Sequence, residues 1–131
     1  MTTPNIAAIE ASYRELTGVL PPSIADRIRL ARLAGRDESI VQIEALRDQL
    51  IMNNPLDTRT AQLVHFAQLL ALGEHDAAAL HAGAAKKAGA TPEDLLGVVE
   101  LALITAGMPA YSRGIAILAK LFPGDQPEHD G

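Results

Sequence analysis

The feature that most constrains this chain is the spacing of its apolar residues. In each long segment they recur every three or four positions rather than alternating. That period is typical of α-helices that bury one face. The first segment shows it clearly, with Ile6, Ile9, Tyr13 and Leu16 on one side. The sequence therefore predicts an all-α fold.

Glycine and proline residues divide the pattern into seven expected helices. The clearest start is Thr91–Asp94, where a threonine cap is followed by proline at the first helical position and by two acidic residues. Ser23 is expected to cap the second helix, and Gly107–Pro109 to separate the last two. The helices are expected over about residues 5–17, 23–35, 37–53 (with residue 39 as the alternative start), 57–72, 74–88, 91–106 and 110–122.

The composition fits a single domain over residues 1–122, because 131 residues are one domain's worth. Apolar residues make up 48% of the chain and aromatic residues only 3%, so alanine and aliphatic side chains must build the core. Such small side chains suit closely packed helices, and their abundance predicts a homo-oligomer. Residues 123–131 lack apolar anchors and are expected to form a flexible tail.

The charge and the cysteine content limit the kinds of partner and the location that can be expected for this chain. The net charge is -5 and no basic cluster exceeds Lys86–Lys87, so no nucleic-acid partner is expected. The longest uncharged stretch, Leu101–Ser112, is too short for a membrane span, which takes about 20 residues. No cysteine is present, and no signal peptide is expected, because no early basic region precedes an apolar block. We expect a cytoplasmic protein without a membrane partner.

His81 is the leading candidate for a reacting group. Its neighbours three and four positions away are Ala77, Ala78, Ala84 and Ala85. The imidazole is therefore expected to face inward, with space beside these small side chains for a ligand. It is either a general acid/base or a core histidine bonded to a backbone carbonyl, and residue statistics alone favour the core role.

Three further residues could complete a site with His81. Glu74 precedes it by two helical turns, about 10 Å along the axis, so it would act through water or substrate. Otherwise Glu74 only stabilises a helix N-terminus. Gln62 and His65 lie one turn apart on the preceding helix, where each suits either a pocket wall or a solvated edge.

Tyr111 and Arg113 follow the expected turn at Gly107–Pro109. They could bind a carboxylate near a helix N-terminus, or they could equally be a half-buried tyrosine and a surface arginine. No metal site is expected. His75 and His81 are six positions apart, and neither a His-x-x-x-His pair nor an acidic cluster occurs.

Three motifs follow one another in a recognisable order. They are Pro55–Thr60 leading into a helix, Gly89–Leu95 beginning eight residues after His81, and Ala106–Ala110. Together, best over residues 55–118, they resemble the carboxymuconolactone decarboxylase family, which includes the alkyl hydroperoxide reductase D group. The resemblance implies an alkyl hydroperoxide reductase D-like all-helical fold, trimers or hexamers, and a pocket beside the helix that carries His81.

The resemblance also shows which activity to exclude. In the peroxidase branch a Cys-x-x-Cys pair precedes the histidine, and a glutamate on the preceding helix relays protons. The corresponding positions here are Glu74 and Ala77, and Gln62. A peroxidase of this type needs a thiolate nucleophile and a resolving thiol, so the chain is not expected to be a thiol peroxidase.

The decarboxylase branch carries a carboxylate before the histidine, an arginine near the start of the preceding helix, and a tyrosine before the Ala-Gly-x-Pro turn. The corresponding positions hold Ala77 and Ala78, Ala61, and Thr105. What the resemblance retains is the scaffold, His81 and the turn at Pro109.

The sequence thus predicts an enzyme that needs no cofactor and performs a decarboxylation, or a related lyase or isomerase step, on a small organic acid or lactone. His81 is the expected general acid/base, oriented by Glu74 or Gln62. His65, Tyr111 and Arg113 are the expected substrate-binding residues. The alternative is a non-catalytic oligomeric protein on the same fold, with a small-ligand-binding or structural role.

Overall fold

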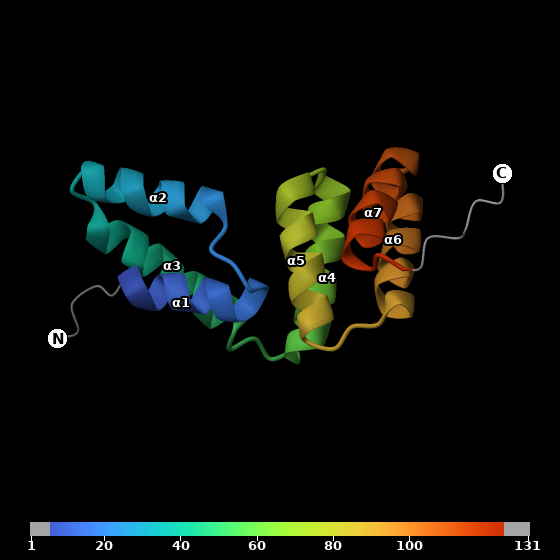
Figure 1. Cartoon of the computed structure of the whole chain (residues 1–131), viewed down its shortest axis with the longest axis horizontal. Coiled ribbons are helices and arrows are strands. Elements are labelled where there is room, and N and C mark those ends of the chain that lie inside the picture. Colours follow the sequence, from blue (N-terminus) through green and yellow to red (C-terminus); the bar gives the residue numbers. More distant parts are fainter. Residues whose placement is uncertain (1–5, 125–131) are drawn as a thin grey trace. The chain divides into compact units, whose positions relative to one another are not determined.

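The computed structural model describes residues 6–124, which form seven α-helices and no strand (Figure 1). The prediction of an all-α fold is confirmed, and so is the expected number of helices. The helices are α1 (Ile6–Thr17), α2 (Pro22–Leu33), α3 (Asp37–Ile51), α4 (Thr58–Leu72), α5 (His75–Lys87), α6 (Pro92–Ala106) and α7 (Met108–Leu121).

The start of α6 follows its predicted signal, whereas the start of α2 does not. The Thr91 hydroxyl accepts a hydrogen bond from the backbone N–H of Asp94, and the Asp94 carboxylate accepts one from the backbone N–H of Thr91. This reciprocal pair is a capping box. Ser23 was expected to cap α2, but Pro21 occupies the N-cap and Pro22 the first helical position. The fixed φ angle of proline already suits a first helical turn, which explains the difference.

The break between α6 and α7 is shorter than predicted. Only Gly107 separates the two helices, with φ at +87°, in the left-handed region that favours glycine. Met108 and Pro109 were expected in the turn, but both lie in the first turn of α7. Proline is tolerated there because the first N–H groups of a helix have no partner within the helix.

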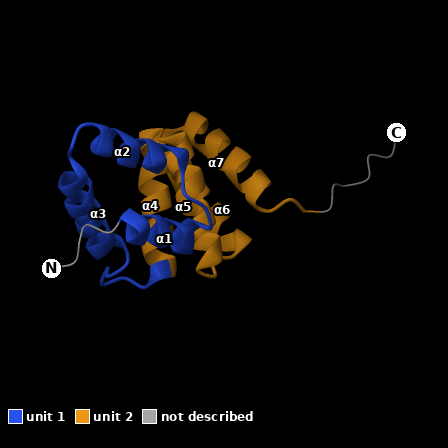
Figure 2. Cartoon of the chain, turned by 60° about the vertical axis from the view of Figure 1, so that its left-hand side comes forward, with its two compact units in different colours: residues 1–58 blue, residues 59–131 orange. Residues whose placement is uncertain are grey.

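The chain divides into two compact units, Met1–Thr58 and Arg59–Gly131, called unit 1 and unit 2 below (Figure 2). Unit 1 contains α1, α2 and α3, and α3 packs against both of the others. The residues predicted on the inner face of α1 are all buried. The core cluster of unit 1 consists of Ile6, Ile9, Tyr13, Ile24, Ile28 and Ile40.

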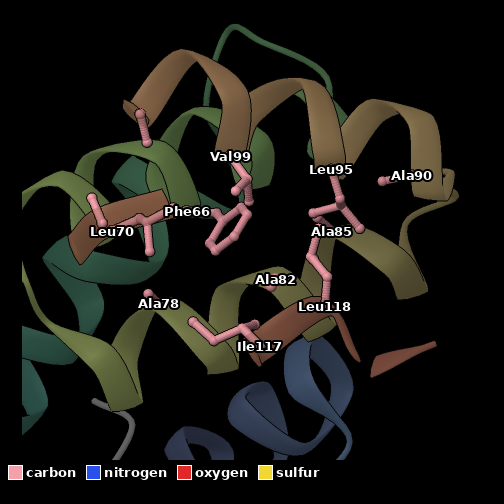
Figure 3. Packing of buried hydrophobic residues seen from close by; sticks show 12 residues of the cluster. Phe66, Leu70, Ala78, Ala82, Ala85, Ala90, Leu95, Val99, Ile117 and Leu118 are labelled. Atoms are coloured by element: carbon pink, nitrogen blue, oxygen red, sulfur yellow. The ribbon is translucent and has the colours of Figure 1, made fainter. Parts of the chain in front are cut away.

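Unit 2 contains α4 to α7, and α7 packs against both α5 and α6. Gly114 permits a close approach here. A Cβ atom at Gly114 would lie 2.7 Å from both methyl carbons of Val99 and 3.0 Å from Cδ2 of Leu70. The core of unit 2, drawn in Figure 3, consists of Phe66, Leu70, Ala78, Ala82, Ala85, Ala90, Leu95, Val99, Ala102, Ala110, Ile117 and Leu118.

Several apolar residues at helical spacing are not buried. On α3, Ile40 is buried, whereas Ile43, Leu46 and Leu50 are each more than half exposed. On α6, Ile104 is 83% exposed. Apolar spacing identifies one side of a helix but does not specify which element covers that side, so the burial of these residues could not be inferred from the pattern.

The structure divides into two compact units, and the single domain predicted over residues 1–122 stays a prediction. The predicted flexible tail lies outside the described residues from position 125 onward. Among the helices found between residues 6 and 124, none combines the length and the apolar content that crossing a membrane requires.

Candidate functional site

His81 lies on the buried face of α5, where its alanine neighbours predict it. The residue is only 4% exposed, and Ala78, Ala82 and Ala85 on the same helix are also buried. Gln62 on α4 is 1% exposed and lies one turn before the fully buried Phe66. Two polar side chains, one from each helix, are therefore embedded in the apolar core of unit 2.

A hydrogen bond joins these two side chains directly. Nδ1 of His81 lies 2.7 Å from Oε1 of Gln62. An amide oxygen carries no hydrogen, so it can only accept, and Nδ1 must be the donor. The proton of a neutral His81 ring is thereby assigned to Nδ1, and Nε2 carries the lone pair. Burial strengthens such a bond, because the surrounding dielectric is low.

His65 lies next to this pair, one turn after Gln62 on α4. The ring centroids of His65 and His81 are 4.0 Å apart, with an angle of 42° between the planes. His65 is only partly buried, whereas His81 is enclosed. The structure thus brings together three of the predicted residues, Gln62, His65 and His81, in one small polar cluster called the histidine cluster below.

Glu74 lies apart from the histidine cluster along α5. It is the N-cap residue of that helix, it is exposed, and its side chain makes no capping hydrogen bond. Two helical turns of α5 separate Glu74 from His81. A role for Glu74 beside His81 therefore requires a bridging group.

Arg113 and Tyr111, both on α7, take different positions. Nη2 of Arg113 donates to the backbone carbonyl of Leu70, at 3.5 Å, near the end of α4. This end of α4 is opposite the one that carries Gln62. Tyr111 is partly buried and packs against the core of unit 2. Arg113 thus contacts the end of α4, while Tyr111 contributes to packing.

Sequence reasoning missed a buried polar pair in unit 1. The Tyr13 hydroxyl donates to Oε2 of Glu44 at 2.7 Å, and both side chains are buried. Burial and the hydrogen bond to Glu44 raise the pKa of the Tyr13 phenol far above its usual value. The available signal was the spacing of Glu44, which lies four positions after the buried Ile40 and therefore on the same face of α3.

A second contact missed from the sequence is the ion pair between Arg59 and Asp94. Nη1 of Arg59, at the start of α4, lies 2.8 Å from Oδ2 of Asp94, in the capping box of α6. Within residues 6–124, no group of three or more histidine, aspartate or glutamate side chains is arranged to hold a metal ion.

Comparison with known proteins gives one match. The sequence model of the carboxymuconolactone decarboxylase family matches residues 41–120. This span includes most of α3, all of α4 to α6 and nearly all of α7, and therefore every site residue that the sequence predicted. No curated protein and no solved structure matches the chain.

Proposed function

This chain belongs to the carboxymuconolactone decarboxylase family, and we propose that it is an enzyme that acts on a small organic acid or lactone by acid/base chemistry without a cofactor. The observation that carries the proposal is the hydrogen bond between His81 and Gln62. It holds an imidazole in one tautomer inside the core of unit 2. General acid/base catalysis needs such a positioned group whose proton can be exchanged near neutral pH.

Gln62 acts as a positioning residue in this proposal. Its Oε1 accepts the Nδ1 proton of His81, so the proton exchanged with substrate is the one at Nε2. An amide does not take up this proton itself, unlike a carboxylate. Acid/base function is thereby confined to the imidazoles of the cluster.

In a decarboxylation at this site, the bond between carbon and the carboxylate breaks and carbon dioxide leaves. The electron pair stays on the carbon next to a carbonyl group. The protonated His81 delivers its Nε2 proton to that carbon, and the neutral ring regains a proton from solvent. His65, whose ring lies 4.0 Å from that of His81, would contact the carboxylate of the bound acid.

The remaining candidates have supporting roles in the proposal. Arg113, which contacts the end of α4, and Tyr111, packed on the core, would shape the far side of the binding region. Glu74 would act on His81 only through water or substrate. The chain contains no cysteine, so we expect no thiol-dependent turnover of cumene hydroperoxide.

The burial of the histidine cluster favours a second candidate function. With His81 at 4% and Gln62 at 1% exposure, the pair could serve only to satisfy two polar groups in the core. The protein would then be a non-catalytic oligomer on the same fold, with a small-ligand-binding or structural role.

One substitution separates the two functions. His81→Gln should lower turnover of an active member of a panel of small lactones and keto acids by about 10²–10⁴-fold, and leave the fold intact. His75→Gln is the matched control, because His75 is an exposed histidine on the same helix. Turnover and melting temperature are measured on both variants.

Two results would contradict the enzymatic proposal. One is a His81→Gln variant with normal kinetics. The other is a wild-type protein that turns over no member of the panel. A purely structural His81 predicts a different pattern, in which the substitution lowers stability by about 1–3 kcal/mol through an unsatisfied buried group and leaves any activity unchanged.

A further inference from the structure

The outer side of α3 carries three large apolar side chains that the fold leaves exposed. Ile43, Leu46 and Leu50 are 57–60% exposed. They follow one another at spacings of three and four positions, which places them side by side on one face of a single helix. We call these three residues the α3 stripe. The core of unit 1 buries a different side of α3, the one that carries Ile40 and Glu44, so the helix is apolar on two sides and only partly covered.

The polar residues that extend and flank the α3 stripe are uncharged. They share its side of the helix by their spacing and are Ser39, Gln42, Gln49 and Asn53. Nδ2 of Asn53 donates to Oε1 of Gln49 at 3.3 Å, which leaves both amides with further donors and acceptor positions. A carboxylate at the edge of this face, that of Glu38, accepts a hydrogen bond from Gln42.

The other charged side chains along α3 are directed toward α1. The guanidinium of Arg47 packs over the Tyr13 ring, with its central carbon 4.4 Å from the ring centroid. Glu44 accepts a hydrogen bond from Tyr13, and Asp48 accepts one from Ser12. The α3 stripe therefore offers no cation to a nucleic acid or an acidic surface, and no carboxylate to a basic peptide.

The same composition suits a surface that pairs with its own copy. In a two-fold interface the same patch is used on both subunits, so every group on the patch meets groups of its own kind. Charged side chains repel their copies, whereas apolar side chains pack together. Glutamine and asparagine amides both donate and accept hydrogen bonds, so they can bond to one another.

We propose that the α3 stripe binds the α3 stripe of a second copy of this chain across a two-fold axis. Contiguous exposed apolar side chains are typical of such interaction sites. Leu46, in the middle of the stripe, lies nearest to the axis, and the flanking amides exchange hydrogen bonds between the copies. Because each chain uses this contact once, any assembly that contains it has an even number of chains.

The first test measures the mass of the full-length protein in solution. Leu46→Lys places a charge at the centre of the stripe, where it meets its own copy, and light scattering at micromolar concentration should show the mass of the assembly halved. Ala45→Lys is the matched control, because it adds the same charge at the neighbouring exposed position, on another side of the same helix. It should leave the mass unchanged. Lysine is a good helix former, so both variants should keep the helical circular dichroism signal.

Two results would overturn the proposal. One is a wild-type assembly with an odd number of chains, including a monomer. The other is an unchanged mass for Leu46→Lys. In that case the melting temperature shows why: a lower value than in Ala45→Lys would mean that another part of the same chain covers the stripe, and an equal value that nothing in the purified protein binds it.

A cross-linking experiment tests the location of the contact. The chain has no cysteine, so Leu46→Cys introduces its only thiol. A short bis-maleimide should join two copies of this variant into a covalent dimer on a denaturing gel. Ala45→Cys, which presents a thiol on another side of α3, should give far less dimer. Equal yields from the two variants would contradict the assignment to the α3 stripe.

Discussion

At the scale of single residues, each unit encloses a polar side chain that makes a short hydrogen bond to another helix. Glu44 accepts from Tyr13 in unit 1, and His81 donates to Gln62 in unit 2, each over 2.7 Å and each between two helices. Removing one partner of such a bond leaves the other buried and unsatisfied. These residues therefore link the stability of each unit to its polar chemistry.

Tyr13→Phe should show this at neutral pH. The substitution keeps the ring but removes the donor to Glu44, so the free energy of unfolding should fall by about 1–3 kcal/mol. Tyr111→Phe is the control, because Tyr111 is only partly buried. Denaturant titration of both variants measures the difference, and an equal loss in the two would contradict the role given to Tyr13.

The same variant makes a second prediction at alkaline pH. The pKa of Tyr13 is raised by folding, so above pH of about 10 the unfolded chain loses a proton that the folded chain retains. Wild-type stability should then fall by up to about 1.4 kcal/mol per pH unit from this group. Because Tyr13→Phe lacks the group, its deficit relative to wild type should shrink as the pH rises from 10. Unfolding titrations between pH 7 and pH 11 measure the deficit, and a value independent of pH would refute this.

At the scale of helices, the capping box of α6 joins two elements. Oδ2 of Asp94 accepts from the backbone N–H of Thr91 and also pairs with Arg59 of α4. The hydrogen bond from the Thr91 backbone is the main reason that the pKa of Asp94 is lowered. A carboxylate with a lowered pKa contributes stability above its unfolded pKa and loses it in acid, so this cap should weaken as the pH falls below about 4.

Thr91→Ala tests the cap itself. It removes the hydroxyl that accepts from the backbone of Asp94, and caps of this kind are worth about 0.5–2 kcal/mol. Thr105→Ala, at an exposed position near the end of the same helix, is the control and should be neutral or slightly stabilising. Thermal melts measure the stability of both variants. A Thr91→Ala protein as stable as the Thr105→Ala control would show that the Thr91 hydroxyl contributes nothing.

Two glycines within helices give opposite predictions. Gly114→Ala places a Cβ atom 2.7 Å from the methyl carbons of Val99, and the resulting overpacking should cost about 1–3 kcal/mol. Gly97→Ala meets no atom within 4 Å, so it should stabilise α6 by about 0.5–1 kcal/mol. Circular dichroism melts should move in opposite directions, and a shift of the same sign in both would refute the close contact at Gly114.

The period of the apolar residues and the positions of glycine and proline were enough to predict the seven helices. The apolar face of α1 and the cap at Thr91 followed from local patterns, which depend on neighbours a few residues away. The start of α2 did not, because Pro21 and Pro22 favour an earlier start than Ser23. Local rules identify a helix more reliably than its first residue.

The candidate site was predictable only in part, for a physical reason. The alanines around His81 indicate its buried face, since they lie on the same helix. The contact between Oε1 of Gln62 and Nδ1 of His81 depends on how α4 packs on α5, because the two residues are nineteen positions apart in the sequence. The same holds for Tyr13 and Glu44. They lie on different helices, so spacing along one helix cannot predict that they form a pair.

At the scale of the whole molecule, exposed apolar side chains support the proposal that the chain forms a homo-oligomer. Leu101 and Ile104, three positions apart near the end of α6, are 70% and 83% exposed, and Met108 at the start of α7 is 59% exposed. Large exposed apolar side chains of this kind are typical of surfaces that another chain covers. We propose a trimer or a hexamer.

Light scattering should therefore give three or six times the chain mass of 13.9 kDa at micromolar concentration. Ile104→Lys replaces one of these exposed apolar side chains by a charged one and should shift the protein toward smaller species. Ser112→Lys adds the same charge at an exposed polar position of α7 and should leave the mass unchanged. A monomeric wild type, or an unchanged mass for Ile104→Lys, would contradict this assignment.

The placement of the two tyrosines has a consequence for spectroscopy. The chain has no tryptophan, and Tyr13 lies in unit 1 while Tyr111 lies in unit 2. In a Tyr111→Phe variant the intrinsic fluorescence therefore reports only on unit 1, and in a Tyr13→Phe variant only on unit 2. Within one variant, a fluorescence transition that coincides with the circular dichroism transition of all helices would mean that the chain unfolds as one cooperative body, and separate transitions that each unit unfolds by itself.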